Sequence, residues 1–123
     1  MWRGFLFTSS FRKELNMFTR VVELTSKPGK SKELSNAINE KALPTLQKQS
    51  GFMDEILLVS NAEPDQVLAI SFWKTRDDAE RYHREQYKNV AEAVRPLLGS
   101  EPSIRTFDVH TSSGLKVVAG RAA

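Results

Sequence analysis

A helical segment predicted over residues 76–98 carries imidazole, amide and phenol groups close to its apolar side. His83 and Gln86 fall near the middle of the apolar stripe, and Tyr82 and Tyr87 flank it on either side. Drawn at 3.6 residues per turn, the stripe consists of Ala79, Val90, Val94 and Leu97. Polar groups that converge on an otherwise apolar surface are what a small-molecule pocket needs.

Two interpretations of these side chains remain open. A buried polar group without a partner costs about 1–3 kcal/mol, so His83 and Gln86 either bond to strand backbone or water, or they line a cavity. Trp73, just before this helix, is either a pocket wall or a hydrophobic plug at the strand–helix junction. Arg20 and Arg105 lie on predicted strands, where they either bind an anionic ligand or form ion pairs at the surface or a dimer rim.

The elements that position these residues follow from periodicity. Strand-like runs rich in β-branched and apolar residues are found at 18–25, 53–60, 66–74 and 103–111. A helical period predicts helices over 31–50 and 76–98. Pro44 lies inside the first helix, where we expect a kink or a tightened last turn.

The order of these elements, β-α-β-β-α-β, predicts an α+β fold of the ferredoxin-like type. It would have a four-stranded antiparallel sheet with two helices on one face. The 56–59 run is continuously apolar and 66–73 is nearly so, and strands that are apolar on both sides need cover on both. We therefore predict a homodimer in which two sheets bury each other's open faces.

Composition and charge exclude several classes of function. The chain has no cysteine, which excludes disulfides, iron–sulfur clusters and thiol nucleophiles, and its two histidines make a His-rich metal site unexpected. The net charge of +3 is terminal, with +2 in 1–16, −1 in 17–113 and +2 in 114–123. We therefore expect no nucleic-acid partner. No apolar run approaches the roughly 20 residues of a membrane span, so we expect no membrane partner and a cytoplasmic location.

Domain boundaries follow from the same patterns. Residues 1–16 are predicted to be a poorly ordered N-terminal extension, 17–111 the folded domain and 112–123 a flexible tail. Neither a glycine-rich phosphate loop nor a G-x-S-x-G nucleophile motif is present.

Three groups of spaced residues carry a family resemblance. They are the first strand with the KPGK turn at 27–30, the LPTL run at 43–46 followed by Gly51-Phe52, and the FWKT run at 72–75 leading to Tyr82-His83 and Tyr87. In these features the chain resembles the antibiotic biosynthesis monooxygenase family, whose members are dimeric α+β barrels. Some members are oxygenases that convert a polycyclic phenol or quinol and O₂ into a quinone without any metal, flavin or other prosthetic group.

The resemblance implies roles for the residues singled out above. His83 would be the catalytic base with Tyr82 beside it, Tyr87 and Gln86 would bind and orient the substrate, and Trp73 would form a stacking wall. No cofactor and no metal are expected. Haem degradation is not expected either, because that branch of the family uses an Asn on the first strand, and 18–25 contains none.

Three hypotheses of function follow. The first is a cofactor-independent monooxygenase that oxidises an aromatic, quinol- or phenol-like small molecule with O₂. The alternative is a non-catalytic dimer of the same fold that binds or protects such a molecule. The third is an isomerase, decarboxylase or cyclase acting through His83.

Overall fold

The structure is a computed structural model, and it describes residues 17–113. The predicted N-terminal extension, 1–16, and residues 114–123 of the predicted tail lie outside the described residues.

Four antiparallel strands form one sheet in the order β2-β3-β1-β4. Their bounds are Phe18–Thr25 for β1, Phe52–Val59 for β2, Gln66–Trp73 for β3 and Ser103–Asp108 for β4. The predicted boundaries of the first three strands are correct to within one residue, while β4 ends three residues earlier than predicted. β2 and β3 form the predicted antiparallel hairpin, with a bulge near Met53.

The first helical segment widens in its middle. α2 (Ser31–Ala37) passes into a π-helical turn, η1 (Ile38–Ala42), and then into α3 (Leu43–Gln47). Pro44 has no N–H and cannot complete the α-helical bond to the carbonyl four residues earlier. The N–H of Leu43 instead reaches back five residues to the carbonyl of Ile38. The helix is therefore widened ahead of Pro44, and its last turn is tightened as predicted, because the N–H groups of Lys48 and Gln49 donate to the carbonyls of Thr45 and Leu46, three residues earlier.

The second helical segment is broken, whereas a single helix over 76–98 was predicted. The last residue of α4 (Arg76–Glu85) is Glu85. The next residue, Gln86, has a φ of −125° and a ψ of −26°, which lie outside the helical region. α5 (Tyr87–Val94) and a 3₁₀ turn, η2 (Arg95–Leu97), follow. The start of this segment at Arg76 was predicted correctly. The Thr75 side chain caps it by accepting a hydrogen bond from the Asp78 N–H at 3.1 Å.

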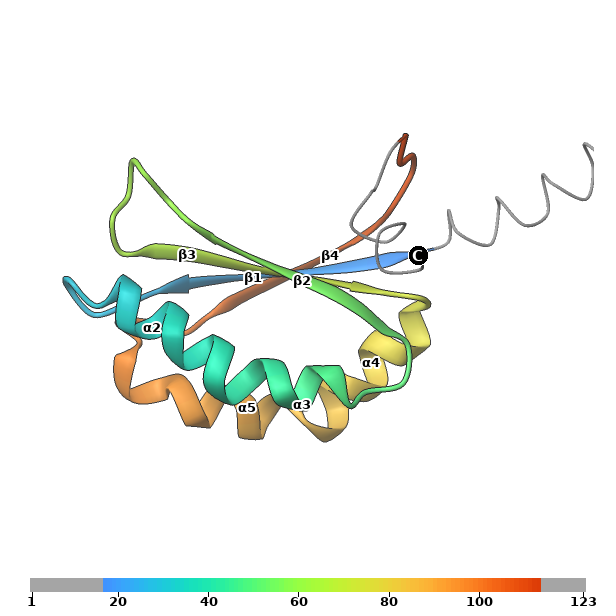
Figure 1. Ribbon diagram of the computed structural model, residues 1–123, viewed down its shortest axis with the longest axis horizontal. Helices are drawn as coiled ribbons and strands as arrows, with labels where there is room; N and C mark the ends of the chain where they lie inside the picture. Colours follow the sequence, from blue (N-terminus) through green and yellow to red (C-terminus); the bar gives the residue numbers. More distant parts are fainter. Residues whose placement is uncertain (1–16, 114–123) are drawn as a thin grey trace, which may run out of the picture.

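All of these helices lie on one face of the sheet, as Figure 1 shows with the sheet seen edge-on. This confirms the predicted ferredoxin-like α+β class. One buried cluster joins β1 and β3 to α2 and α5, around Val22, Leu34 and Val67. A second cluster lies around Trp73 and Tyr82, where Trp73 is fully buried.

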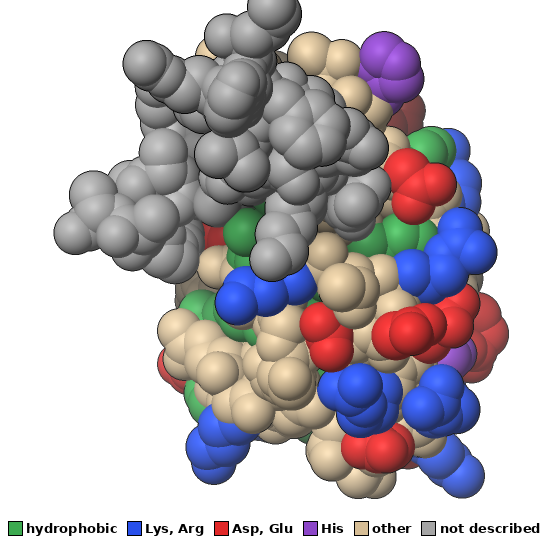
Figure 2. Space-filling view, turned by 90° about the vertical axis from the view of Figure 1, so that its right-hand side faces the viewer, with side chains coloured by type: hydrophobic (Ala, Val, Ile, Leu, Met, Phe, Trp, Pro, Cys, Tyr) green, Lys and Arg blue, Asp and Glu red, His purple; other side chains and the backbone are tan. Residues whose placement is uncertain are grey.

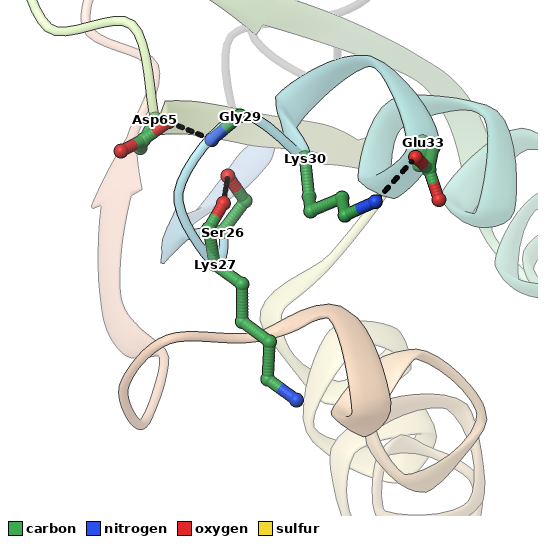
Figure 3. A network of polar contacts seen from close by, with 6 residues as sticks. All are labelled: Ser26, Lys27, Gly29, Lys30, Glu33 and Asp65. Atoms are coloured by element: carbon green, nitrogen blue, oxygen red, sulfur yellow. Dashed lines mark hydrogen bonds and ion pairs between the residues drawn. The ribbon is translucent and has the colours of Figure 1, made fainter.

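The KPGK turn after β1 is held by the loop of the β2–β3 hairpin (Figure 3). The Gly29 N–H donates to Asp65 Oδ1 at 3.1 Å, and the Ser26 N–H donates to the Asp65 carbonyl at 2.8 Å. Gly29 has a φ of +73°, which a residue without a side chain adopts at no steric cost. The turn therefore fixes where α2 begins relative to the sheet.

The second face of the sheet is largely apolar. Opposite residues in the strand registers place Val21, Ile56 and Ile70 in one row on this face. Leu58 and Phe107 lie on the same face and are 45% and 49% exposed. No helix formed by residues 17–113 lies on it.

Basic and acidic side chains are interspersed on the face shown in Figure 2. Several ion pairs of the helical segments join side chains one turn apart, such as Arg95 with Glu92 at 2.9 Å. None of the helices formed by residues 17–113 is long and apolar enough to cross a membrane.

Candidate active site

A cavity lies between the helix-covered face of the sheet and the helices. Its apolar wall comes from β1, β3, η1, α3 and α5 and consists of Val22, Leu24, Ile38, Ala42, Leu46, Ala69, Val90, Ala91 and Val94. Its polar lining consists of Arg20, Glu55, Ser71, Tyr82 and Tyr87, and Pro102 completes the boundary. One end of the cavity is therefore apolar and the other carries both charge and hydrogen-bonding groups.

The polar end is built by strand register. Glu55 on β2 lies opposite Ser71 on β3, and Ser71 lies opposite Arg20 on β1. Neighbouring strands are about 4.8 Å apart, so the backbones of Glu55 and Arg20 are about 10 Å apart with Ser71 between them. The three side chains form one row across the sheet, beneath the tyrosines of α4 and α5.

Arg20 is buried, with 4% of its surface exposed. None of the ion pairs formed within residues 17–113 includes it. Its guanidinium carbon lies 5.2 Å from the ring centre of Tyr82 and 4.8 Å from that of Tyr87, which are cation–π distances. Burial lowers the pKa of Arg20, although the group stays charged. The cavity thus contains a positive charge with no carboxylate partner.

His83 lies at the surface and does not line the cavity, but it contacts Arg20. Its Nδ1 accepts a hydrogen bond from Arg20 Nη2 at 2.9 Å, because a guanidinium can only donate. The neutral imidazole then carries its proton on Nε2. Partial burial, and then the charge of Arg20, lower the pKa of His83, which favours this neutral form.

The prediction that His83 and Gln86 point inward is wrong. His83 is exposed, Gln86 is half-buried, and neither lines the cavity. The apolar stripe was drawn across Gln86 as if the helix were continuous, and the break there changes the phase. The inward residue of α4 at this level is Tyr82, which is 3% exposed.

Tyr82 and Tyr87 both line the cavity. Burial raises the pKa of Tyr82 to about 12, against the opposing effect of Arg20, and burial also raises the pKa of Tyr87. Both side chains therefore stay neutral phenols at physiological pH and can donate hydrogen bonds. Tyr87 also stacks on His83, with ring centres 5.2 Å apart.

Trp73 does not line the cavity. It is fully buried, packs edge-on against Phe52 and lies 5.3 Å from the Tyr82 ring, so its position is that of the hydrophobic plug. Its indole N–H donates to Ser71 Oγ at 2.9 Å. Because this bond occupies only an acceptor site of the hydroxyl, Ser71 keeps its own proton to donate.

Glu55 is the residue of this cavity that sequence reasoning missed. It is half-buried, and burial raises the pKa of its carboxyl group to about 7, with a further contribution from Asp54. The signal was present in the sequence, because Glu55 alternates with Leu57, which faces the helices. The same alternation places Arg20 with Phe18 and Val22 on the helix-covered face of β1.

Arg105, the other strand arginine, is not part of the cavity. It is exposed and pairs with Glu23 at 3.1 Å, as the surface interpretation predicted. Among residues 17–113 there is also no cluster of three or more His, Asp or Glu side chains placed to hold a metal ion.

The cavity has a volume of about 50 Å³. This is room for a few water molecules, whereas a cavity that binds benzene has about 150 Å³. An aromatic ligand can therefore bind only if side chains lining the cavity move. Tyr87 and Val90, which lie one turn apart on the same face of α5, are only partly buried and so have room to move.

The fold and the cavity define a small α+β protein of the ferredoxin-like type, with an ionisable site between its sheet and its helices. A family model described as antibiotic biosynthesis monooxygenase matches residues 17–93. The chain belongs to this family.

Solved structures share the fold at low sequence identity. SnoaB, a cofactor-independent oxygenase from Streptomyces nogalater, is 20% identical with a TM-score of 0.67, over 80% of this chain and 97% of that one. A conserved protein from Methanosarcina mazei Go1 is 19% identical with a TM-score of 0.66, over 79% and 96% of the two chains. A search of curated proteins finds no significant match.

Proposed function

We propose that the protein is a cofactor-independent monooxygenase that oxidises a phenol- or quinol-like small molecule with O₂. The observation that carries the proposal is the buried, unpaired guanidinium of Arg20 in a cavity with one apolar end. A buried charge without a counter-ion is costly to the fold, and it is matched only when an anion binds beside it. Membership of the monooxygenase family and the likeness to SnoaB support the reaction class.

The reaction assigns a task to each end of the cavity. The ring of the substrate would lie against the apolar wall, and its hydroxyl would lie at the polar end, near Arg20. Arg20 stabilises the phenolate, and Tyr82 and Tyr87 donate hydrogen bonds that orient it. The electron-rich phenolate is the species that reduces O₂, so stabilising it inside a water-poor cavity promotes the reaction.

The overall conversion balances without another reductant. O₂ forms a bond to a ring carbon of the phenolate, and that carbon then loses its hydrogen as a proton, which ends on the oxygen atom that leaves. The O–O bond then breaks, so one oxygen atom becomes the new quinone carbonyl and the other leaves as water. The substrate supplies all the electrons that O₂ accepts.

His83 has a positioning role in this proposal. Its one lone-pair nitrogen is engaged by Arg20, so it has no free acceptor for a substrate proton in this arrangement. It positions the guanidinium through the hydrogen bond at Nδ1. Gln86 acts through the helix break at its own position, and Trp73 acts through its hydrogen bond to Ser71. The chemistry at the substrate is then left to groups that line the cavity.

The test is oxygen uptake with a panel of naphthols and hydroquinones in metal-free buffer. We expect uptake by the wild type and a loss of at least about 100-fold for Arg20→Met, which keeps the length of the side chain but removes the charge. Arg105→Met, at the exposed strand arginine, is the matched control and should retain activity. Binding of the panel without any uptake would replace the oxygenase by a binding protein of the same fold.

The proposal includes a homodimer formed through the open face of the sheet. The apolar row of Val21, Ile56 and Ile70 and the exposed Leu58 support it. Leu58→Glu should give a monomer in analytical ultracentrifugation. Val59→Glu changes the next residue of β2, which is 51% exposed but points to the other face, and should leave the dimer intact. A monomeric wild type would refute this part of the proposal.

A further inference from the structure

We infer that Glu55 is the group that accepts the proton from the hydroxyl of the bound molecule. The inference rests on the proposed function, since it assumes a phenolic substrate in the same cavity. In the row of Glu55, Ser71 and Arg20 that lines the cavity, the carboxylate of Glu55 would be the base.

The position of Glu55 suits this task. Its side chain lines the cavity, and no hydrogen bond or ion pair joins its carboxyl group to another side chain within residues 17–113. The nearest charged partner in the row, Arg20, lies two strands away. A substrate hydroxyl placed over Ser71 would come between an acceptor on one side and a cation on the other.

The other titratable groups around the cavity do not suit this task. Arg20 on β1 is permanently charged and cannot accept a proton. Tyr82 on α4 and Tyr87 on α5 are neutral donors, because burial raises the pKa of both. The first helical segment contributes only apolar residues to the lining, namely Ile38, Ala42 and Leu46. Asp54, the neighbour of Glu55 on β2, points to the opposite face of the sheet.

The protonation state of Glu55 is suited to a base that works near neutral pH. With a pKa of about 7, its carboxyl group is ionised in a large fraction of molecules at that pH and is a stronger base than an exposed glutamate. Burial is the main cause, and no counter-ion stabilises the carboxylate.

The step itself is a simple proton transfer. The O–H bond of the substrate breaks, the proton forms a bond to a carboxylate oxygen of Glu55, and the electron pair stays on the substrate oxygen. Arg20 then faces the new phenolate. When the O–O bond breaks later in the reaction, Glu55 returns this proton to the leaving oxygen, which also takes up the proton lost by the ring carbon and departs as water. Glu55 thus ends each cycle in the ionised form in which it began.

The first experiment measures the titration of Glu55 directly in the full chain. Glutamate is labelled with ¹³C at the side-chain carboxyl, and Glu55→Gln identifies the resonance. We expect the signal to titrate near pH 7 and to shift to higher pH when 4-nitrophenol is added at millimolar concentration, because a neighbouring phenolate disfavours the carboxylate. A midpoint in the usual range of about 4–5, or no response to 4-nitrophenol, would overturn the inference even if phenols are oxidised.

The second experiment uses the pH profile of oxygen uptake. In the wild type kcat/KM should rise with pH through a midpoint near 7. Glu55→Gln should remove this rise and lower kcat/KM about 100-fold at pH 8. Glu40→Gln, at an exposed position of η1, is the matched control and should keep the wild-type profile. An unchanged profile in Glu55→Gln would refute the inference.

The two experiments separate the inference from the proposed function. If Glu55 titrates near pH 7 and responds to 4-nitrophenol, but no phenol of the panel is oxidised, the proton acceptor stands and the oxygenase does not. If phenols are oxidised with a profile that does not depend on Glu55, the oxygenase stands and another base must be sought.

Discussion

The buried carboxyl group of Glu55 should make the stability of the protein depend on pH in a way that one substitution removes. An acid whose pKa is raised on folding stabilises the fold only below its unfolded pKa, and this contribution is lost as the pH rises through the folded value. For Glu55 the window runs from an ordinary value near 4.5 to about 7. At 1.36 kcal/mol for each pH unit, the loss across this window is about 3 kcal/mol.

The measurement is the free energy of unfolding in urea, at pH 4 and at pH 8 and at one protein concentration. Gln has nearly the shape of a protonated Glu, so Glu55→Gln should resemble the wild type at pH 4. At pH 8 it should be more stable than the wild type by about 3 kcal/mol. Glu40→Gln removes a charge from an exposed helical position and should differ from the wild type by no more than about 0.5 kcal/mol at either pH.

The reasoning fails if Glu55→Gln and the wild type keep the same difference at both pH values. That result would mean that the carboxylate is as well hydrated in the folded protein as in the unfolded chain. The cavity would then contain no carboxyl group with a raised pKa, and the base proposed for the reaction would be lost with it.

Three further predictions concern the surroundings of the cavity. Arg20→Met should leave the free energy of unfolding in urea unchanged or raise it by about 1–2 kcal/mol, because the cost of burying a cation offsets its cation–π contacts. A decrease of more than about 3 kcal/mol would show that Arg20 stabilises the fold. His83→Ala should lower oxygen uptake by about 10-fold while near-UV circular dichroism keeps the wild-type signal, since His83 is exposed and acts through Arg20; a chain that fails to fold would contradict this. Gly51→Ala should lower Tm and reduce the free energy of unfolding by about 2 kcal/mol or more, measured by calorimetry, because Gly51 has a φ of +83° and an added Cβ would collide with Asp78. An unchanged Tm would refute this packing.

The strands were predictable because they are short runs rich in β-branched and apolar residues and turn residues separate them. The residues 61–65 between β2 and β3, for example, mark a hairpin by composition alone. The order of the elements then left few ways to form the sheet, and the observed class is the predicted one.

The candidate site was harder to predict, because small irregularities in the helices decide which side chains face inward. Gln86 is neither Gly nor Pro, so nothing in its type indicates a break, and an unbroken wheel turns His83 inward in place of Tyr82. Glu55 was overlooked for a related reason, since a single acid at the start of an apolar strand is usually solvated. Its burial depends on the helices that cover it, and these come from distant parts of the sequence.

The placement of the ionisable groups on strands has a consequence for how related proteins can diverge. The hydrogen-bond ladder of three adjacent strands sets the separation of Glu55 and Arg20, and this ladder does not depend on the residues of the helices. Substitutions at Ile38, Leu46 or Val90 can therefore reshape the space for the carbon skeleton of a ligand while the groups of the proposed proton transfer and charge stabilisation stay in place. Related proteins could thus bind different carbon skeletons while they keep the same row of ionisable groups.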